Sequence, residues 1–113
     1  MKFASEKIIA AQSMATSFES APILLDQIYG FSFQAVFTGA PDGSFKLQVS
    51  NDDKSFGFQP VNWTDITGST QVITEAGDIV WNFNGAFYKW VKVVYEASSG
   101  SGSCDITYSS KGA

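Results

Sequence analysis

The chain has 113 residues, which suits one domain with a single hydrophobic core. It carries 7 basic residues, all of them lysine, and 11 acidic residues, which gives a formal net charge of −4. It has no histidine, no arginine and one cysteine, so imidazole catalysis, a histidine metal site, an arginine clamp on phosphate and an internal disulfide are all excluded. The negative charge argues against partners such as nucleic acid or an anionic membrane surface, and the sequence has no apolar run of membrane-spanning length.

The first residues show no steady hydrophobic period. Met1–Ala11 mixes charged and apolar residues, and Glu6 and Lys7 interrupt the apolar part, so no export signal is predicted and synthesis in the cytoplasm is expected. We interpret this segment as a possible extended arm that orders on a partner. Gln12 to Phe18 is the first candidate strand.

The middle of the chain alternates with a period of two, which predicts half-buried strands. Phe31, Phe33, Ala35 and Phe37 share one face of the first such strand. Residues 39–43 contain Gly, Pro and Asp, the residue types that turns favour, and 45–49 alternates again. The pattern predicts that 31–38 and 45–49 form a hairpin.

Four further strands are predicted after a loop at 51–60. They cover 61–64, 70–74, 79–83 and 87–95, and the pair Asn84-Gly85 indicates a tight turn before the last of these. Both faces of 87–95 are largely apolar, so this strand is expected to be central in its sheet.

A Ser/Gly-rich stretch at 97–103 predicts a flexible, long hairpin loop, and a final strand begins at Cys104. Short strands at regular spacing indicate an all-β fold. The expectation is one domain, 1–113, formed by a single antiparallel β-sandwich. It would be jelly-roll-like, with eight or nine short strands and an N-terminal arm (1–11).

No set of residues predicts catalysis, so the chain is interpreted as not an enzyme. Cys104 has no basic neighbour that would form a thiolate and is expected in the core. No cofactor and no metal are predicted, because the acidic residues lie where turns require them and match no calcium-binding motif. These turn residues are Asp42, Asn51, Asp52, Asp53, Asp65 and Asp78.

The aromatic residues leave three interpretations open. Tryptophan and phenylalanine in strands are most often core, but exposed ones serve protein interfaces or stack on sugars. The residues concerned are Phe56, Phe58, Trp63, Trp81, Tyr88 and Trp90.

The order of several short motifs resembles a group of small virion-associated β-sandwich proteins of tailed bacteriophages. The likeness covers about Ser20 to Lys111, and Lys92 stands where the pattern has arginine. The motifs are Gln34–Gly39, Gly43–Asp52, Val61–Ile66, Tyr88–Tyr95, Ser99–Gly102 and Lys111.

The resemblance implies a structural virion component, located in the virion and most readily on the capsid surface. We expect a capsid decoration (cement) protein that binds and stabilises the major capsid protein, or other virion proteins, as a homo-oligomer around a symmetry axis. The alternative is a glycan-binding, adhesin-type module on a tail or head fibre. The residues expected to bind the partner are Phe3, Ile8, Ile9, Phe56, Phe58 and Trp63.

Overall fold

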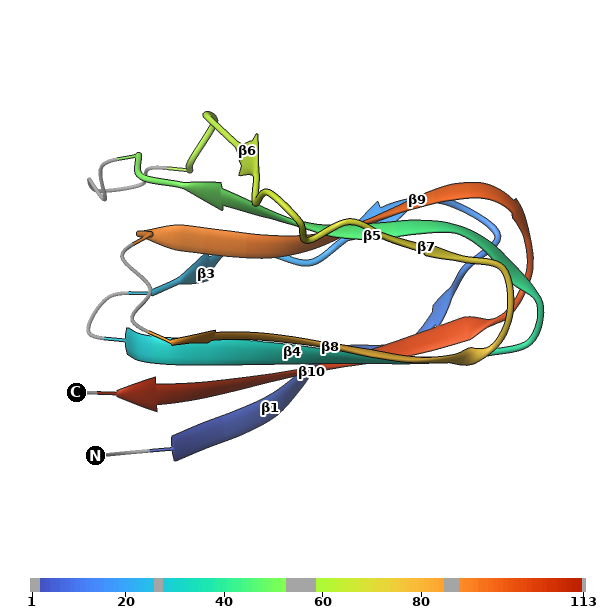
Figure 1. Cartoon of the computed structure of the whole chain (residues 1–113), viewed down its shortest axis with the longest axis horizontal. Helices are drawn as coiled ribbons and strands as arrows, with labels where there is room; N and C mark the ends of the chain where they lie inside the picture. The colour runs from blue at the N-terminus through green and yellow to red at the C-terminus, as the bar shows by residue number, and fades with distance from the viewer. Residues whose placement is uncertain (1–2, 26–27, 53–58, 85–87, 113) are drawn as a thin grey trace.

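The computed structural model describes residues 3–25, 28–52, 59–84 and 88–112. These ranges form ten β-strands arranged in two layers, and Figure 1 shows the layers facing each other. No helix among the described residues is long and apolar enough to cross a membrane. The strands are β1 (Phe3–Ser13), β2 (Phe18–Glu19), β3 (Ile23–Leu24), β4 (Ile28–Thr38), β5 (Pro41–Ser50), β6 (Thr64–Asp65), β7 (Gln71–Ile73), β8 (Gly77–Asn84), β9 (Trp90–Gly100) and β10 (Ser103–Gly112).

The strand order is that of a jelly roll. One sheet, called sheet A here, runs β1-β10-β4-β8, and the other, sheet B, runs β2-β9-β5-β6. The short strand β3 pairs with β9 on the same edge as β2, and β7 pairs with β5 on the same edge as β6. Ten strands therefore occupy eight positions, all antiparallel, and the predicted all-β, jelly-roll-like sandwich is confirmed.

The predicted N-terminal arm is instead a strand of the sandwich. Phe3–Ser13 pairs with β10 as β1, at the edge of sheet A. The register shifts between Lys7 and Ile9 and again between Ile9 and Gln12. These irregularities remove the period of two from the sequence, which is why the segment looked unlike a strand.

The predicted hairpin of 31–38 with 45–49 is also wrong. Both segments are strands, but β4 lies in sheet A and β5 in sheet B. The chain passes between the layers at Gly39, whose φ of 84° is left-handed. A hairpin and an arch between sheets have the same local pattern, because both place the apolar face of each strand toward one core.

The Ser/Gly stretch makes a second short crossing rather than a long hairpin loop. β9 in sheet B extends to Gly100, and β10 in sheet A begins at Ser103. A Cβ on Gly102 would lie 2.0 Å from the backbone oxygen of Thr38, so only glycine fits where the two crossings meet. The Ser101 N–H donates to the Ala40 oxygen at 3.0 Å and joins the crossings.

The core lies between the sheets and is rich in aromatic rings. Phe45 of sheet B is fully buried and contacts the rings of Phe37 and Trp81 from sheet A, at centroid distances of 5.6 and 6.0 Å. It also contacts Phe18 and Tyr95 within sheet B. Phe45 is thus the main aromatic link between the two layers.

Two other strand predictions are wrong, because Gln12–Phe18 spans the bend between β1 and β2, and only Thr64 of the predicted strand 61–64 lies in a strand. The strands predicted at 70–74 and 79–83 are confirmed as β7 and β8. β9 is central in sheet B, between β2 and β5, as its two apolar faces predicted. Trp81 and Cys104 are buried in the core. Gly85 of the predicted turn and Phe87 of the predicted strand 87–95 lie outside the described ranges.

Candidate interaction surface

The residues predicted to bind a partner do not come together at one place. Phe3 pairs with Lys111 at the end of the β1–β10 ladder, in sheet A. Trp63 directly precedes β6, in sheet B. Phe56 and Phe58 lie outside the described residues.

The apolar residues of β1 are already used inside the molecule. Ile8 and Ile9 are partly buried and pack against the core cluster. Their side chains therefore contribute to the fold of this chain, and their predicted contact with a partner stays a prediction.

Trp63 has partners within the chain. The Lys92 ammonium lies 4.4 Å from the centroid of the Trp63 ring, which is a cation–π contact. The indole N–H donates to the Pro60 oxygen at 3.2 Å, and Lys92 also pairs with Glu19 at 3.2 Å. One face of the ring is thus covered by Lys92, which is only 8% exposed.

The outer surface of sheet B is crossed by further ion pairs. Lys46 lies 3.2 Å from Glu96 and 3.4 Å from Asp65, and Gln48 donates to Asp65 at 2.8 Å. The hydrogen bond to Glu96 raises the pKa of Lys46, and the one from Gln48 lowers the pKa of Asp65. Lys46 and Asp65 therefore stay charged at neutral pH, and their charges are balanced within the chain.

The outer surface of sheet A is uncharged at its centre, and Asp78, Asp105 and Lys111 lie toward its ends. Inward residues of β4, β8 and β10 alternate with outward hydroxyl, amide and valine side chains. The register aligns Ser109 with Ser32 and Asn82 in one row across three strands. The next row contains Thr107, Gln34 and Val80.

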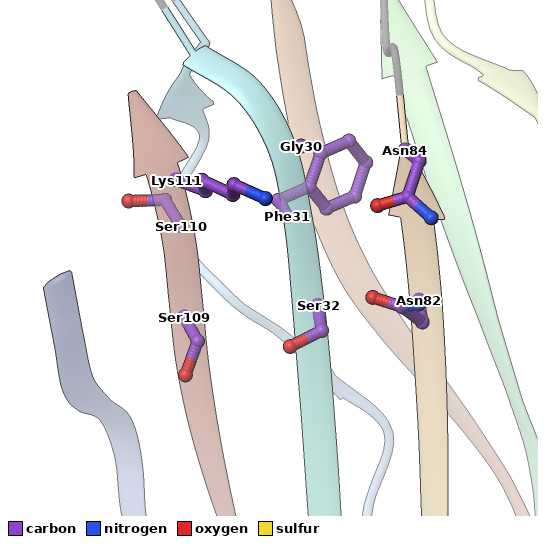
Figure 2. Close-up of a pocket in the computed structure, with 8 residues that line it drawn as sticks. All are labelled: Gly30, Phe31, Ser32, Asn82, Asn84, Ser109, Ser110 and Lys111. Atoms are coloured by element: carbon purple, nitrogen blue, oxygen red, sulfur yellow. The ribbon is translucent and has the colours of Figure 1, made fainter. Parts of the chain in front are cut away.

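A hollow of about 210 Å³ lies at one end of this surface. Figure 2 shows that its lining comes from three neighbouring strands, β10, β4 and β8. The central position is Gly30, where a Cβ would lie 2.8 Å from the Phe83 oxygen. The lining residues are Gly30, Phe31, Ser32, Asn82, Asn84, Ser109, Ser110 and Lys111.

The chemistry of the hollow is that of hydrogen bonding. Its two amides and its hydroxyls can donate or accept toward a polar group, and a neutral peptide or a sugar presents such groups. This surface is not predictable from the sequence, because serine and asparagine on the outer side of a strand carry no distinctive pattern. Only the register reveals that they converge.

The structure gives no support to a reactive thiol or to catalytic acids on the turns. Burial raises the pKa of Cys104 to about 12, so its thiol is protonated at neutral pH. Asp52 accepts backbone hydrogen bonds from Val61 at 2.7 Å and Asn62 at 2.9 Å, which is the structural role expected of a turn residue. Within the described ranges, no group of three or more Cys, Asp or Glu residues could hold a metal ion.

Comparisons with known proteins give likeness at the level of the fold. No family model and no curated protein sequence matches the chain. The SPBc2 prophage-derived protein YomS superposes with a TM-score of 0.56 at 11% identity, over 96% of this chain and 93% of that one. The PBSX exported protein XepA gives 0.60 at 9% identity, over 97% of this chain and 37% of XepA.

A carbohydrate-binding protein also shares the architecture. Chitosan-binding module 1 of a Paenibacillus chitosanase/glucanase has a TM-score of 0.50 at 19% identity, with coverage of 95% and 92%. The same sandwich thus occurs in a prophage-derived protein and in a chitosan-binding module. At these identities the likeness establishes the fold alone.

Proposed function

We propose that the chain is a structural component of a phage particle, and specifically a capsid decoration protein. It binds the major capsid protein through the outer surface of sheet A and has no catalytic role. The observation that carries this proposal is the uncharged centre of this surface, where two rows of hydroxyl, amide and valine side chains lie between rows that carry Asp78, Asp105 and Lys111. Such a composition suits a protein contact, whose centre is depleted of charge.

Two further observations support the proposal. The motif order resembles virion-associated sandwich proteins, and the fold is shared with the prophage-derived YomS. On the opposite surface, Lys46 and Lys92 are engaged in ion pairs within the chain.

The test uses purified protein and capsids that lack it. We expect the added protein to cosediment with capsids and to raise the temperature at which they release their contents. Gln34→Lys places a charge in the centre of the sheet A surface and is expected to weaken cosedimentation. Gln71→Lys is the matched control, since Gln71 is an exposed residue of β7 in sheet B.

Two results would count against this function. Capsids whose heat resistance is the same with and without the protein would contradict stabilisation. Equal loss of binding for Gln34→Lys and Gln71→Lys would contradict sheet A as the contact surface.

The glycan-binding alternative required exposed aromatic platforms. Trp81 is buried, Trp63 is covered on one face by Lys92, and the Trp90 indole donates to the Asp52 oxygen at 3.3 Å. Trp81 therefore offers no platform, and Trp63 and Trp90 are each held by contacts within the chain. Tryptophan fluorescence that changes on addition of a sugar would revive this alternative.

A further inference from the structure

The four edges of the sandwich are protected unequally. An exposed strand edge presents unpaired N–H and C=O groups and is a template for another strand, so proteins usually interrupt, shorten or charge their edges. Three edges of this molecule carry such protection. The fourth, β8 in sheet A, does not.

The edge formed by β1 is irregular. Two register shifts interrupt its pairing with β10, and Ala11 has a φ of 49°. The side chains of Glu6 and Lys7 add charge to its middle. A second strand could not pair along β1 without breaks.

The two edges of sheet B are fragmentary. One consists of β2 and β3, of two residues each, with Pro22 between them. The other consists of β6 and β7, of two and three residues. Such short pieces offer few consecutive backbone groups to a partner.

β8 is long and regular by contrast. All eight residues, Gly77–Asn84, pair with β4 without a register shift. In the described part of the chain, β4 is the only strand that pairs with β8, so the far edge of β8 remains open. The strand carries one charged residue, Asp78, and no proline or lysine.

We infer that β8 is a self-association edge, on which β8 of a second copy adds in antiparallel fashion about a two-fold axis. The two sheets A then form one continuous sheet of eight strands. This inference does not rest on capsid binding, because it concerns the chain alone.

The side chains of β8 favour a second copy as the occupant. A register centred on Val80 places the two Val80 side chains opposite each other, and each is 62% exposed in the single chain. It also places Asp78 of one copy opposite Asn82 of the other, so a carboxylate meets an amide that can donate to it. The same register therefore covers an exposed apolar side chain and avoids opposing like charges.

The first test compares one substitution at three sites by sedimentation velocity over a wide range of concentration. The wild type is expected to dimerise as concentration rises. Val80→Lys, which sets two ammonium groups face to face, should weaken the dimer by at least about tenfold. Val36→Lys on central β4 and Val72→Lys on β7 are the controls, since both valines are exposed, at 44% and 76%.

A second measurement keeps the inference testable if Val80→Lys fails to fold. Val80→Cys is expected to form a disulfide-linked dimer under mild oxidation, and Cys104 does not compete because its thiol is buried. Amide hydrogen exchange in Gly77–Asn84 should slow as the wild-type concentration rises.

Several outcomes overturn the inference. They are a wild type that is monomeric at every concentration, and a dimer that Val80→Lys leaves intact. A dimer weakened equally by Val36→Lys indicates face-to-face contact instead. Protection of β8 that appears only on adding a capsid protein indicates another chain as the occupant.

Discussion

The outer surfaces of the two sheets differ in how they use their polar groups. On sheet B, Lys46 and Lys92 pair with acidic residues, and Lys92 covers the Trp63 ring. On sheet A, hydroxyls and amides dominate the centre, and Lys7 forms an ion pair with Asp105 across 3.6 Å between half-exposed side chains. The difference teaches that the charged groups of sheet B are mostly paired within the chain, whereas the centre of the sheet A surface consists of uncharged polar and apolar side chains.

The largest expected loss of stability comes from a substitution in the core that both sheets share. Phe45→Ala removes the ring that joins the layers, and we expect the free energy of unfolding to fall by about 3–5 kcal/mol. Chemical denaturation measures it. Val72→Ala, at an exposed site, is the control and should change stability by less than about 0.5 kcal/mol. Similar losses for the two variants would contradict the central place of Phe45.

The next largest loss of stability is expected at the crossing from β9 in sheet B to β10 in sheet A. Gly102→Ala is expected to cost about 1–3 kcal/mol or more, because φ is 124° and the new Cβ meets the Thr38 oxygen. Gly68→Ala is the matched control, with a φ of 81° but open space around it, so backbone strain alone should cost about 1 kcal/mol. If thermal unfolding shows that Gly102→Ala and Gly68→Ala lose the same stability, steric conflict with Thr38 does not contribute to the loss at Gly102.

A smaller effect compares one lysine from each surface directly. Lys92→Met is expected to lower the free energy of unfolding by about 1–2 kcal/mol, since it removes both a cation–π contact and a shielded ion pair. Lys7→Met should change it by less than about 0.5 kcal/mol, because that pair is largely solvated. Urea titrations of both variants check this. A larger loss for Lys7→Met would reverse the contrast between the surfaces.

The smallest expected effect is on how the free energy of unfolding depends on pH in acid solution. The pKa of Asp65 is lowered on folding, so its contribution is present above the unfolded pKa and is lost as pH falls through the folded one. Asp65→Asn should therefore make stability fall less steeply below about pH 4. Denaturation midpoints measured against pH test this, with Asp105→Asn as the counterpart on sheet A, whose pKa is lowered mainly by the Ala11 N–H. A slope unchanged by Asp65→Asn would show that the hydrogen bond from Gln48 does not hold in solution.

Much of the fold could be predicted from local pattern. The alternation of Phe31, Phe33, Ala35 and Phe37 identified the buried face of β4, and all four are buried. The two apolar faces of 87–95 identified the central strand of sheet B. Alternation reports which side of a strand meets the core, because successive side chains point to opposite faces.

The candidate surface could not be predicted in the same way. The sequence predicts Trp63 as an interface residue, but in the structure Lys92 lies over one face of its ring. Ser109, Ser32 and Asn82 are far apart in the sequence and become neighbours only through strand register. No local signal marks an outward serine as part of a shared surface.

The sequence by itself determined the class of fold, the buried faces and the absence of imidazole and guanidinium chemistry. Only the tertiary structure decided that Phe3–Ser13 is a strand, that β4 and β5 lie in different sheets, and which edge is left open. The physical reason is that periodicity is a property of consecutive residues, whereas pairing depends on backbone hydrogen bonds between distant segments. β1 meets its partner β10 only from the other end of the chain.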